Sequence, residues 1–284
     1  MAGTSPTARQ RELGARLRGF RIDRGLTVEH VANELLCSAT KISRLETGAR
    51  RPSLRDVRDL CALYELDETT SAELMSLARG AREPGWWSTY EDLNLDPYIG
   101  LEQEAAAITC YSMSYIPGLL QTAGYADGII KTIAPKMEAH IAGQRVEARM
   151  RRQQVLEKAN RPRYDVLLDE AVMHRGVGGP GVMAAQLDRV LEVMRLGRAT
   201  VQVIPFSAGA YAALEGYFSL LEFAENSDLR PMVFVEGLST NLYLERETDV
   251  ARYREAIEYL RDRALNLRRS AELITRIRDN YVSK

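Results

Sequence analysis

The sequence predicts two domains: an all-α N-terminal domain of five short helices and an α+β C-terminal domain. Its 284 residues exceed the roughly 150 of one ordinary domain. The first 80 residues show only helical spacing of apolar residues, whereas β-rich runs appear after residue 100. Between these regions a Pro-Gly break precedes both tryptophans of the chain, Trp86 and Trp87.

The five N-terminal helices follow from apolar spacing and from residues that start or stop helices. The first is expected over 9–24, with Leu13 and Leu17 inward. The expected N-terminal caps of the others are Thr27, Ser38, Ser53, and Thr70 or Ser71. The expected stops are Gly25, Gly48 and Gly80. Short loops between these helices predict a compact domain over 1–82.

A linker over 83–100 is expected to contain Trp86 and Trp87, whose large amphipathic rings suit a hinge cover or an interdomain seal better than ligand stacking. The C-terminal domain is then expected over 101–284. Its extended runs are 108–116, 164–168, 200–205, 217–223, 232–236 and 241–244. Its helices are expected over 136–160 and 181–195, from 248 onward, and from a cap at Ser270 to Tyr281.

Charge is distributed unevenly along the chain. Residues 1–64 carry 12 Lys and Arg against 7 Asp and Glu, a net charge of +5, and the remainder carries −6. A basic end on an acidic chain is typical of a phosphate-binding module, although a solvated helical surface has the same composition.

Several classes of protein are not expected. No run approaches the roughly 18 apolar residues of a membrane span, and MAGTSPTARQRELG lacks the apolar core of a secretory signal. Three cysteines far apart, Cys37, Cys61 and Cys110, favour reduced thiols in a cytoplasm. The three histidines are too scattered for a metal site, so neither a metal nor another cofactor is expected.

The segment GLTVEHVANELLCSATKISRLETGARRP (25–52) carries the main functional signal. It predicts two short helices joined by a tight turn, with Ile42 and Leu45 of the second helix facing inward. The outward residues of that helix are Ala39, Thr40, Lys41, Ser43, Arg44 and Thr47. A face with no acid before Glu46 can enter a DNA major groove.

This segment resembles the helix-turn-helix of the phage-repressor-like (XRE) class of bacterial regulators. The resemblance implies base reading by Thr40, Lys41 and Arg44. It implies phosphate contacts for Ser38, Ser43, Arg50 and Arg51.

Two positions depart from the pattern of that class, which usually has Gln in place of Val28 and Gly in place of Leu36. Loss of the Gln removes a polar contact that often helps to fix the reading helix on DNA. A leucine with positive φ costs about 1 kcal/mol, so we expect a turn that is strained or differently shaped.

Motifs in the second half resemble the C-terminal domain, of unknown function, in a large actinobacterial regulator family. They are IPGLLQTAGYA (116–126), LLDEAVMHRGVGG (167–179), MAAQLDRVLEV (183–193) and VQVIPFSAGAY (201–211), together with FSLLEF and LYLE. The resemblance implies a transcriptional regulator, often encoded beside a small companion protein, and it implies no reaction or ligand.

An enzyme is not expected. The most reactive cluster is Asp169, Glu170, His174 and Arg175, but adjacent carboxylates on an extended chain point to opposite faces. The run GVGGPG (176–181) lacks the spacing of a P-loop or a dinucleotide fingerprint, so a plain turn is the better interpretation.

The loop PFSAGAYAALEGYF (205–218) has small residues flanked by aromatic ones. One hypothesis is a site for a small protein or metabolite, formed with residues 117–125 and lined by Phe206, Tyr211, Tyr217 and Phe218. The alternative is a packed surface loop with no binding role.

The sequence therefore predicts a cytoplasmic, sequence-specific DNA-binding regulator, located at the nucleoid when bound. We expect a homodimer on an inverted repeat, because one reading helix covers few base pairs. Its contacts would lie in the helices of 136–160 or 248–282. The alternative is an antitoxin-like module that binds a companion protein and has DNA binding as a secondary role. A third, more distant possibility is an enzyme with a DNA-binding head.

Overall fold

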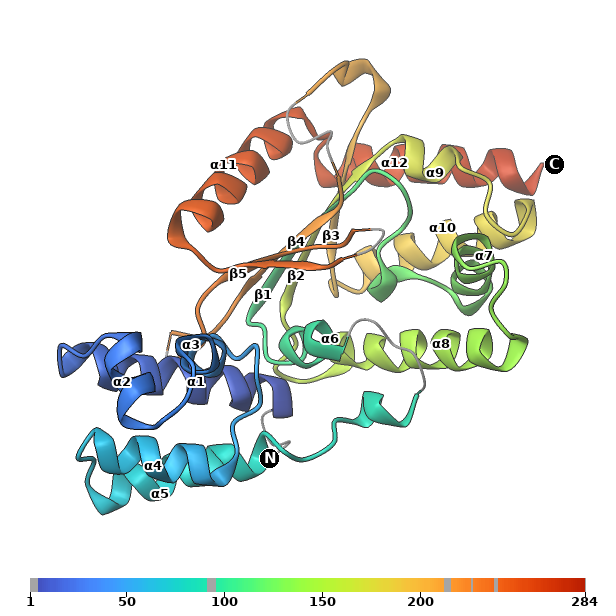
Figure 1. Cartoon of the computed structure of the whole chain (residues 1–284). Coiled ribbons are helices and arrows are strands. Elements are labelled where there is room, and N and C mark those ends of the chain that lie inside the picture. The colour runs from blue at the N-terminus through green and yellow to red at the C-terminus, as the bar shows by residue number, and fades with distance from the viewer. Residues whose placement is uncertain (1–4, 91–95, 212–215, 226, 238–239, 284) are drawn as a thin grey trace. The chain divides into compact units, whose positions relative to one another are not determined.

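The computed structural model describes residues 5–90, 96–211, 216–225, 227–237 and 240–283 (Figure 1). The chain divides into two compact units, which we describe separately. The first contains the described residues of Met1–Ser88, Leu95–Glu104 and Phe223–Arg230. The second contains those of Thr89–Asn94, Ala105–Glu222 and Pro231–Lys284.

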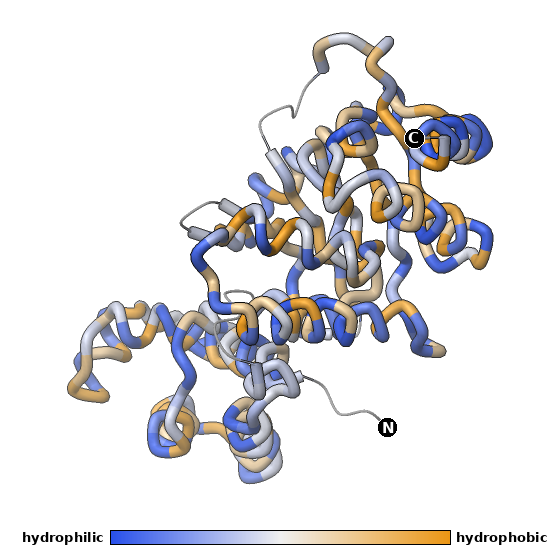
Figure 2. Tube along the Cα trace, turned by 90° about the vertical axis from the view of Figure 1, so that its right-hand side faces the viewer, coloured by the Kyte–Doolittle hydropathy of each residue, from blue (hydrophilic) through white to orange (hydrophobic). Residues whose placement is uncertain are grey.

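Five α-helices lie within the described residues 5–90, which confirms the predicted helical domain. They are α1 (Pro6–Asp23), α2 (Val28–Glu34), α3 (Ala39–Glu46), α4 (Leu54–Leu63) and α5 (Glu68–Gly80). Their shared core includes Leu13, Leu17, Val31, Ile42, Leu45, Val57, Leu60, Tyr64 and Leu74. Apolar and polar residues alternate along these helices, as Figure 2 shows, so each helix buries one face.

The predicted caps Thr27, Ser38 and Ser53 each accept a hydrogen bond from a first-turn amide. The start of α5 differs from the prediction of Thr70 or Ser71. The carboxylate of Asp67 accepts hydrogen bonds from both the N–H and the hydroxyl of Thr70, at 2.8 and 2.7 Å, so this helix begins three residues earlier.

Apart from Thr89 and Tyr90, the described residues of the segment 83–100 belong to the first unit. Trp87 is buried in the short 3-10 helix η1 (Trp86–Thr89), and α6 (Asp96–Glu102) packs on α1. The Ser5 hydroxyl donates a hydrogen bond to the Gly100 carbonyl at 2.7 Å. The contacts thus group α6 with the N-terminal helices rather than leaving it in a free linker, and the boundary at residue 82 stays a prediction.

The described part of the second unit contains a six-stranded sheet of order β3-β2-β1-β4-β5-β6. In that order the strands are Thr200–Ile204, Arg163–Asp169, Ala107–Ser112, Phe218–Glu222, Met232–Val235 and Leu242–Leu244. β1, β2 and β3 are parallel, and each later pairing is antiparallel. β5 therefore runs in the same direction as β1.

The helices of this unit are α7 (Ala123–Ile133), α8 (Ala139–Arg152), α9 (Ala171–His174), α10 (Pro180–Arg195), α11 (Glu247–Arg263) and α12 (Leu267–Val282). Short 3-10 turns are η2 (Gly118–Leu120), η3 (Gln153–Glu157) and η4 (Phe206–Ala208). In Figure 1, α11 lies on one side of the sheet, and α7, α8 and α10 lie on the other. The predicted α+β class is confirmed.

Two predicted helices have different bounds. The helix expected over 136–160 is α8 followed by η3. The last helix begins at Leu267 with Asn266 as its cap. Ser270, the cap predicted from sequence, is instead buried inside α12, where its hydroxyl oxygen accepts a hydrogen bond from the Val203 amide at 3.0 Å. In the described ranges, no helix has the length and apolar character needed to cross a membrane.

Candidate nucleic-acid interface

The turn between α2 and α3 is closed by backbone hydrogen bonds. The amides of Leu36 and Cys37 donate to the carbonyls of Asn33 and Ala32, at 3.1 and 2.8 Å. This pattern requires a left-handed residue after the helix, a position that favours glycine. Leu36 holds it with φ of 49°, and its side chain is 94% exposed. The turn therefore keeps its shape despite the departure from glycine, at the cost of backbone strain.

Leu36→Gly is expected to stabilise the first unit by about 1 kcal/mol, because it relieves left-handed strain and loses no buried surface. Urea unfolding of the full chain measures this change. A matched comparison is Glu65→Gly, since Glu65 has φ of 48° after α4. If both substitutions destabilise the protein, the left-handed backbone at Leu36 and Glu65 is not strained.

The outward face of α3 is polar. Ile42 and Leu45 are buried, as predicted, whereas Thr40, Ser43, Arg44 and Thr47 are exposed. Ser38 caps the helix, and its oxygen accepts a hydrogen bond from the Lys41 amide at 3.1 Å. Its hydroxyl proton remains able to reach a phosphate.

Glu46, the one acid in α3, faces inward. Arg21 donates to its two carboxylate oxygens from Nε and Nη2, at 2.7 and 2.9 Å, and its Nη1 donates to the Leu26 carbonyl at 2.8 Å. The side chains of Arg21 and Glu46 are only 11% and 6% exposed. The hydrogen bond with Glu46 raises the pKa of Arg21 above its usual value. This bidentate pair ties α1 to α3 and removes the only carboxylate of α3 from its surface.

Lys41 is held by α4. Its Nζ lies 2.6 Å from the Asp56 carboxylate, which also accepts a hydrogen bond from the Ser53 amide at 3.1 Å and so completes a capping box. Burial acts to raise the pKa of Asp56, but the hydrogen bonds from Lys41 and Ser53 outweigh it and hold that pKa below its usual range. The Lys41 ammonium is therefore already engaged by a carboxylate of α4.

The remaining predicted cations are available for a ligand. Arg44, Arg50 and Arg51 are exposed, and none of them forms an ion pair within the described ranges. Arg50 and Arg51 lie in the loop after α3, and the Arg50 amide donates to the Arg44 carbonyl at 2.9 Å. This bond keeps the start of the basic loop next to the end of the predicted reading helix.

The four aromatic residues predicted to line one ligand site lie in different surroundings. Tyr211 and Phe218 belong to the core between the sheet and α11. The Tyr211 hydroxyl donates to Asp169 and lies 3.1 Å from the hydroxyl of Tyr111. Burial is the main cause that raises the pKa of Tyr211. These contacts give Tyr211 and Phe218 a structural role, and a binding role for the loop stays a prediction.

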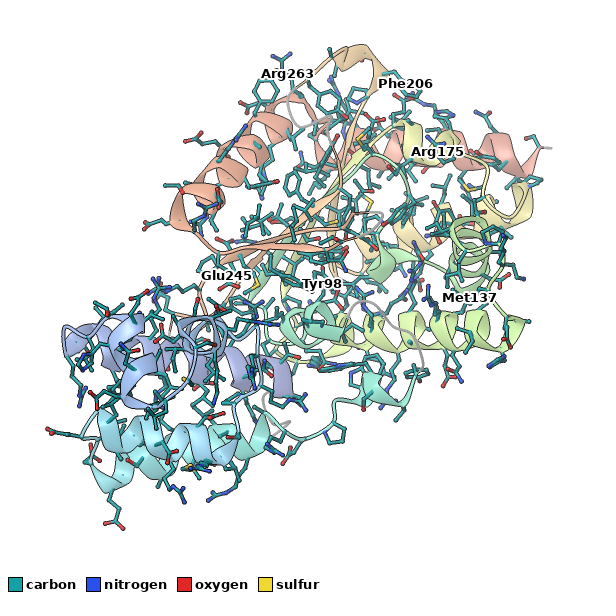
Figure 3. All side chains as sticks on the ribbon, in the orientation of Figure 1. Tyr98, Met137, Arg175, Phe206, Glu245 and Arg263 are labelled. Atoms are coloured by element: carbon teal, nitrogen blue, oxygen red, sulfur yellow. The ribbon has the colours of Figure 1, made fainter. Side chains whose placement is uncertain are left out.

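The other two aromatic residues lie apart from that core. Phe206, labelled in Figure 3, is 58% exposed and stacks on His174 with ring centroids 5.5 Å apart. Tyr217 stacks on Tyr115 at 5.9 Å. Residues 212–215 of the predicted loop lie outside the described residues.

The cluster of Asp169, Glu170 and His174 is also accounted for by local structure. Asp169 accepts a hydrogen bond from the Ala171 amide at 2.8 Å, and Glu170 accepts one from the Phe206 amide at 2.7 Å. The ring of His174 lies 3.4 Å from Glu170. Across the part of the chain that the structure describes, no three His, Cys, Asp or Glu residues are grouped to hold a metal ion.

Models of two protein families match the chain. Residues 12–74 match a family described as a helix-turn-helix domain, and residues 95–276 match the family described as domain of unknown function (DUF5753). No curated protein and no solved structure matches the chain significantly. The helix-turn-helix match indicates a DNA-binding regulator. With the second match covering more than half of its length, the chain belongs to the DUF5753 family and carries a helix-turn-helix domain in front of that domain.

Proposed function

We propose that the chain is a sequence-specific transcriptional regulator of the XRE class and actinobacterial type that binds an inverted repeat in double-stranded DNA as a homodimer. The observation that carries this proposal is the exposed face of α3. It presents Thr40, Ser43 and Arg44 and no carboxylate, because Glu46 is paired inside the unit. Such a face suits the electronegative major groove.

In this proposal Arg44 and Thr40 read base edges. Ser38, Ser43, Arg50 and Arg51 contact phosphates, which fix the register and read no sequence. Lys41 contributes to base reading only after it leaves Asp56, so a Lys41 substitution would change the stability of the unit as well as its DNA affinity.

Dimerisation is assigned to the second unit, through α8 or through α11 and α12. Two recognition helices about 34 Å apart are needed for specific affinity on a two-fold site. We further propose that a small companion protein or ligand controls the dimer by binding this unit, with the exposed Phe206 as a contact for a protein. The chain would act without catalysis, in the cytoplasm and at the nucleoid when bound.

Arg44→Ala is expected to weaken operator binding by about 1–3 kcal/mol and to relax base preference, because a bidentate base contact is lost. Arg51→Ala should weaken all sequences alike and lower the slope of log affinity against log salt by about 1. Gel shifts across a salt series measure both, and band stoichiometry reports whether two chains bind.

The matched control is Arg79→Ala, since Arg79 is exposed on α5, outside the proposed interface. It should bind as the wild type does. Equal losses for Arg44→Ala and Arg79→Ala would show general electrostatics and would contradict reading by α3.

A further inference from the structure

Arg149 of α8 is a partly buried cation, and no described residue gives it a carboxylate partner at ion-pair distance. Its Nη1 donates to the Gln121 side-chain oxygen at 2.9 Å, and among the described residues it forms no ion pair. Burial lowers the pKa of Arg149, and the neighbouring charge of Arg152 lowers it further. A guanidinium has five N–H donors, and removing its charge from water is costly without compensation.

Side-chain amides fix the position of this guanidinium. Gln121 Nε2 donates to the Ile116 carbonyl at 2.6 Å, which leaves its oxygen for Arg149. Gln153 Nε2 donates to the carbonyls of Gly118 and Gln121, at 3.0 and 2.6 Å. The segment after β1 is therefore held against α8 and η3, and Arg149 is placed by a built scaffold.

Two tyrosines and a carboxylate share the surroundings of Arg149. Tyr115 stacks on Tyr217 with ring centroids 5.9 Å apart, and its hydroxyl donates to Glu236 at 2.8 Å. Gln121 connects Arg149 to the Ile116 carbonyl, and Tyr115 is the residue before Ile116, so the stacked tyrosines lie near the guanidinium. The Glu236 carboxylate is exposed and hydrogen-bonded to Tyr115, and it does not pair with Arg149.

Sheet topology brings these residues to one edge. Tyr115 follows the carboxyl end of β1, Tyr217 precedes β4, and Glu236 follows β5. In the register, Phe218 faces Tyr111 on one side and Val235 on the other, so Tyr217 and Glu236 are neighbours one step beyond. β1 is flanked by β2 and by the later strand β4, which makes this edge the point where the strand order reverses.

We infer that Arg149, Tyr115 and Tyr217 form a binding site for a small anion that presents a carboxylate or phosphate group. The anion supplies a countercharge that no described residue gives Arg149, and the tyrosines border it. We identify this site with the ligand site of the second unit proposed above, which makes the regulatory ligand an anion. The regulatory role of the site rests on that proposal. The binding itself requires no DNA.

Calorimetric titration of the full chain with sodium phosphate and with sodium acetate tests the site, with sodium chloride at matched ionic strength as the baseline. The two salts distinguish phosphate from carboxylate recognition. We expect one of them to bind at one site per chain and Arg149→Gln to weaken it by about 30-fold or more. Arg252→Gln is the matched control, because Arg252 is exposed on α11, and it should bind as the wild type does.

Glu236→Gln gives a test of opposite sign. It keeps a hydrogen-bond acceptor for Tyr115 but removes a negative charge that repels an anion bound to Arg149. The affinity for the anion should therefore rise by about threefold or more. This variant decides the matter if Arg149→Gln fails to fold. The site is contradicted if the wild type binds neither salt. It is also contradicted if folded Arg149→Gln binds as the wild type does, or if the affinity of Glu236→Gln for the anion does not rise. Because no DNA is present, failure here leaves the DNA-binding proposal standing.

Discussion

Gly14→Ala is expected to destabilise the first unit by about 3 kcal/mol and to abolish operator binding. A Cβ atom at Gly14 would lie 2.6 Å from the Leu45 carbonyl oxygen and 2.7 Å from that of Glu46. Both are backbone atoms of α3, so no side-chain rotation relieves the clash. The helix proposed to read DNA would have to move away from α1. Urea unfolding and gel shifts of the full chain measure the two effects.

Gly19→Ala in the same helix is the control. An added Cβ at Gly19 meets nothing within 4 Å. Alanine is a better helix former than glycine, so this variant should be more stable by about 0.5–1 kcal/mol. Similar unfolding free energies for the two variants would contradict a close approach of α1 and α3 at Gly14.

Glu46→Leu is expected to cost about 3–5 kcal/mol, because it leaves the Arg21 guanidinium buried without its partner. Arg21→Met should cost a similar amount for the converse reason. The double variant should lose far less than the sum, since an apolar pair of similar volume replaces both charges. Chemical unfolding of the four proteins gives the coupling energy.

The exposed pair of Arg55 and Asp59 is the comparison. Their charged atoms lie 3.5 Å apart, with side chains 82% and 36% exposed. Removal of Asp59 should change stability by no more than about 0.5 kcal/mol. If the losses of Arg21→Met and Glu46→Leu are simply additive, the two residues do not act as a buried pair.

Cap residues and apolar spacing, which are local in the sequence, predicted the helices of the first unit. They did not predict which side chains of different helices contact each other. Ser38 and Ser53 could be predicted as caps because each accepts a hydrogen bond from an amide only three residues later in the sequence. Glu46 looked like the end of a polar face, because nothing in its own helix reveals that Arg21 reaches it from α1. Lys41 likewise looked available for DNA, since its pairing with Asp56 depends on how α3 and α4 pack.

The same distinction explains the second unit. Extended runs predicted the strands, but the spacing of the aromatic residues did not show that the adjacent Tyr217 and Phe218 point in different directions. Successive residues of a strand point to opposite faces, so Phe218 enters the core beneath α11 and Tyr217 faces the other side. Arg149 lies within a helix that the sequence predicts as charged, and its partial burial follows from the fold of residues 116–121 against that helix.

Selection of binding sites from random double-stranded DNA by the full chain tests the central claim most directly. The account predicts enrichment of an inverted repeat whose half-site centres lie about one helical turn apart. It also predicts that Arg44→Ala loses preference at the same base position in each half-site and keeps the spacing. Recovery of no shared sequence by the folded wild type would contradict the account, and so would an unchanged consensus selected by Arg44→Ala.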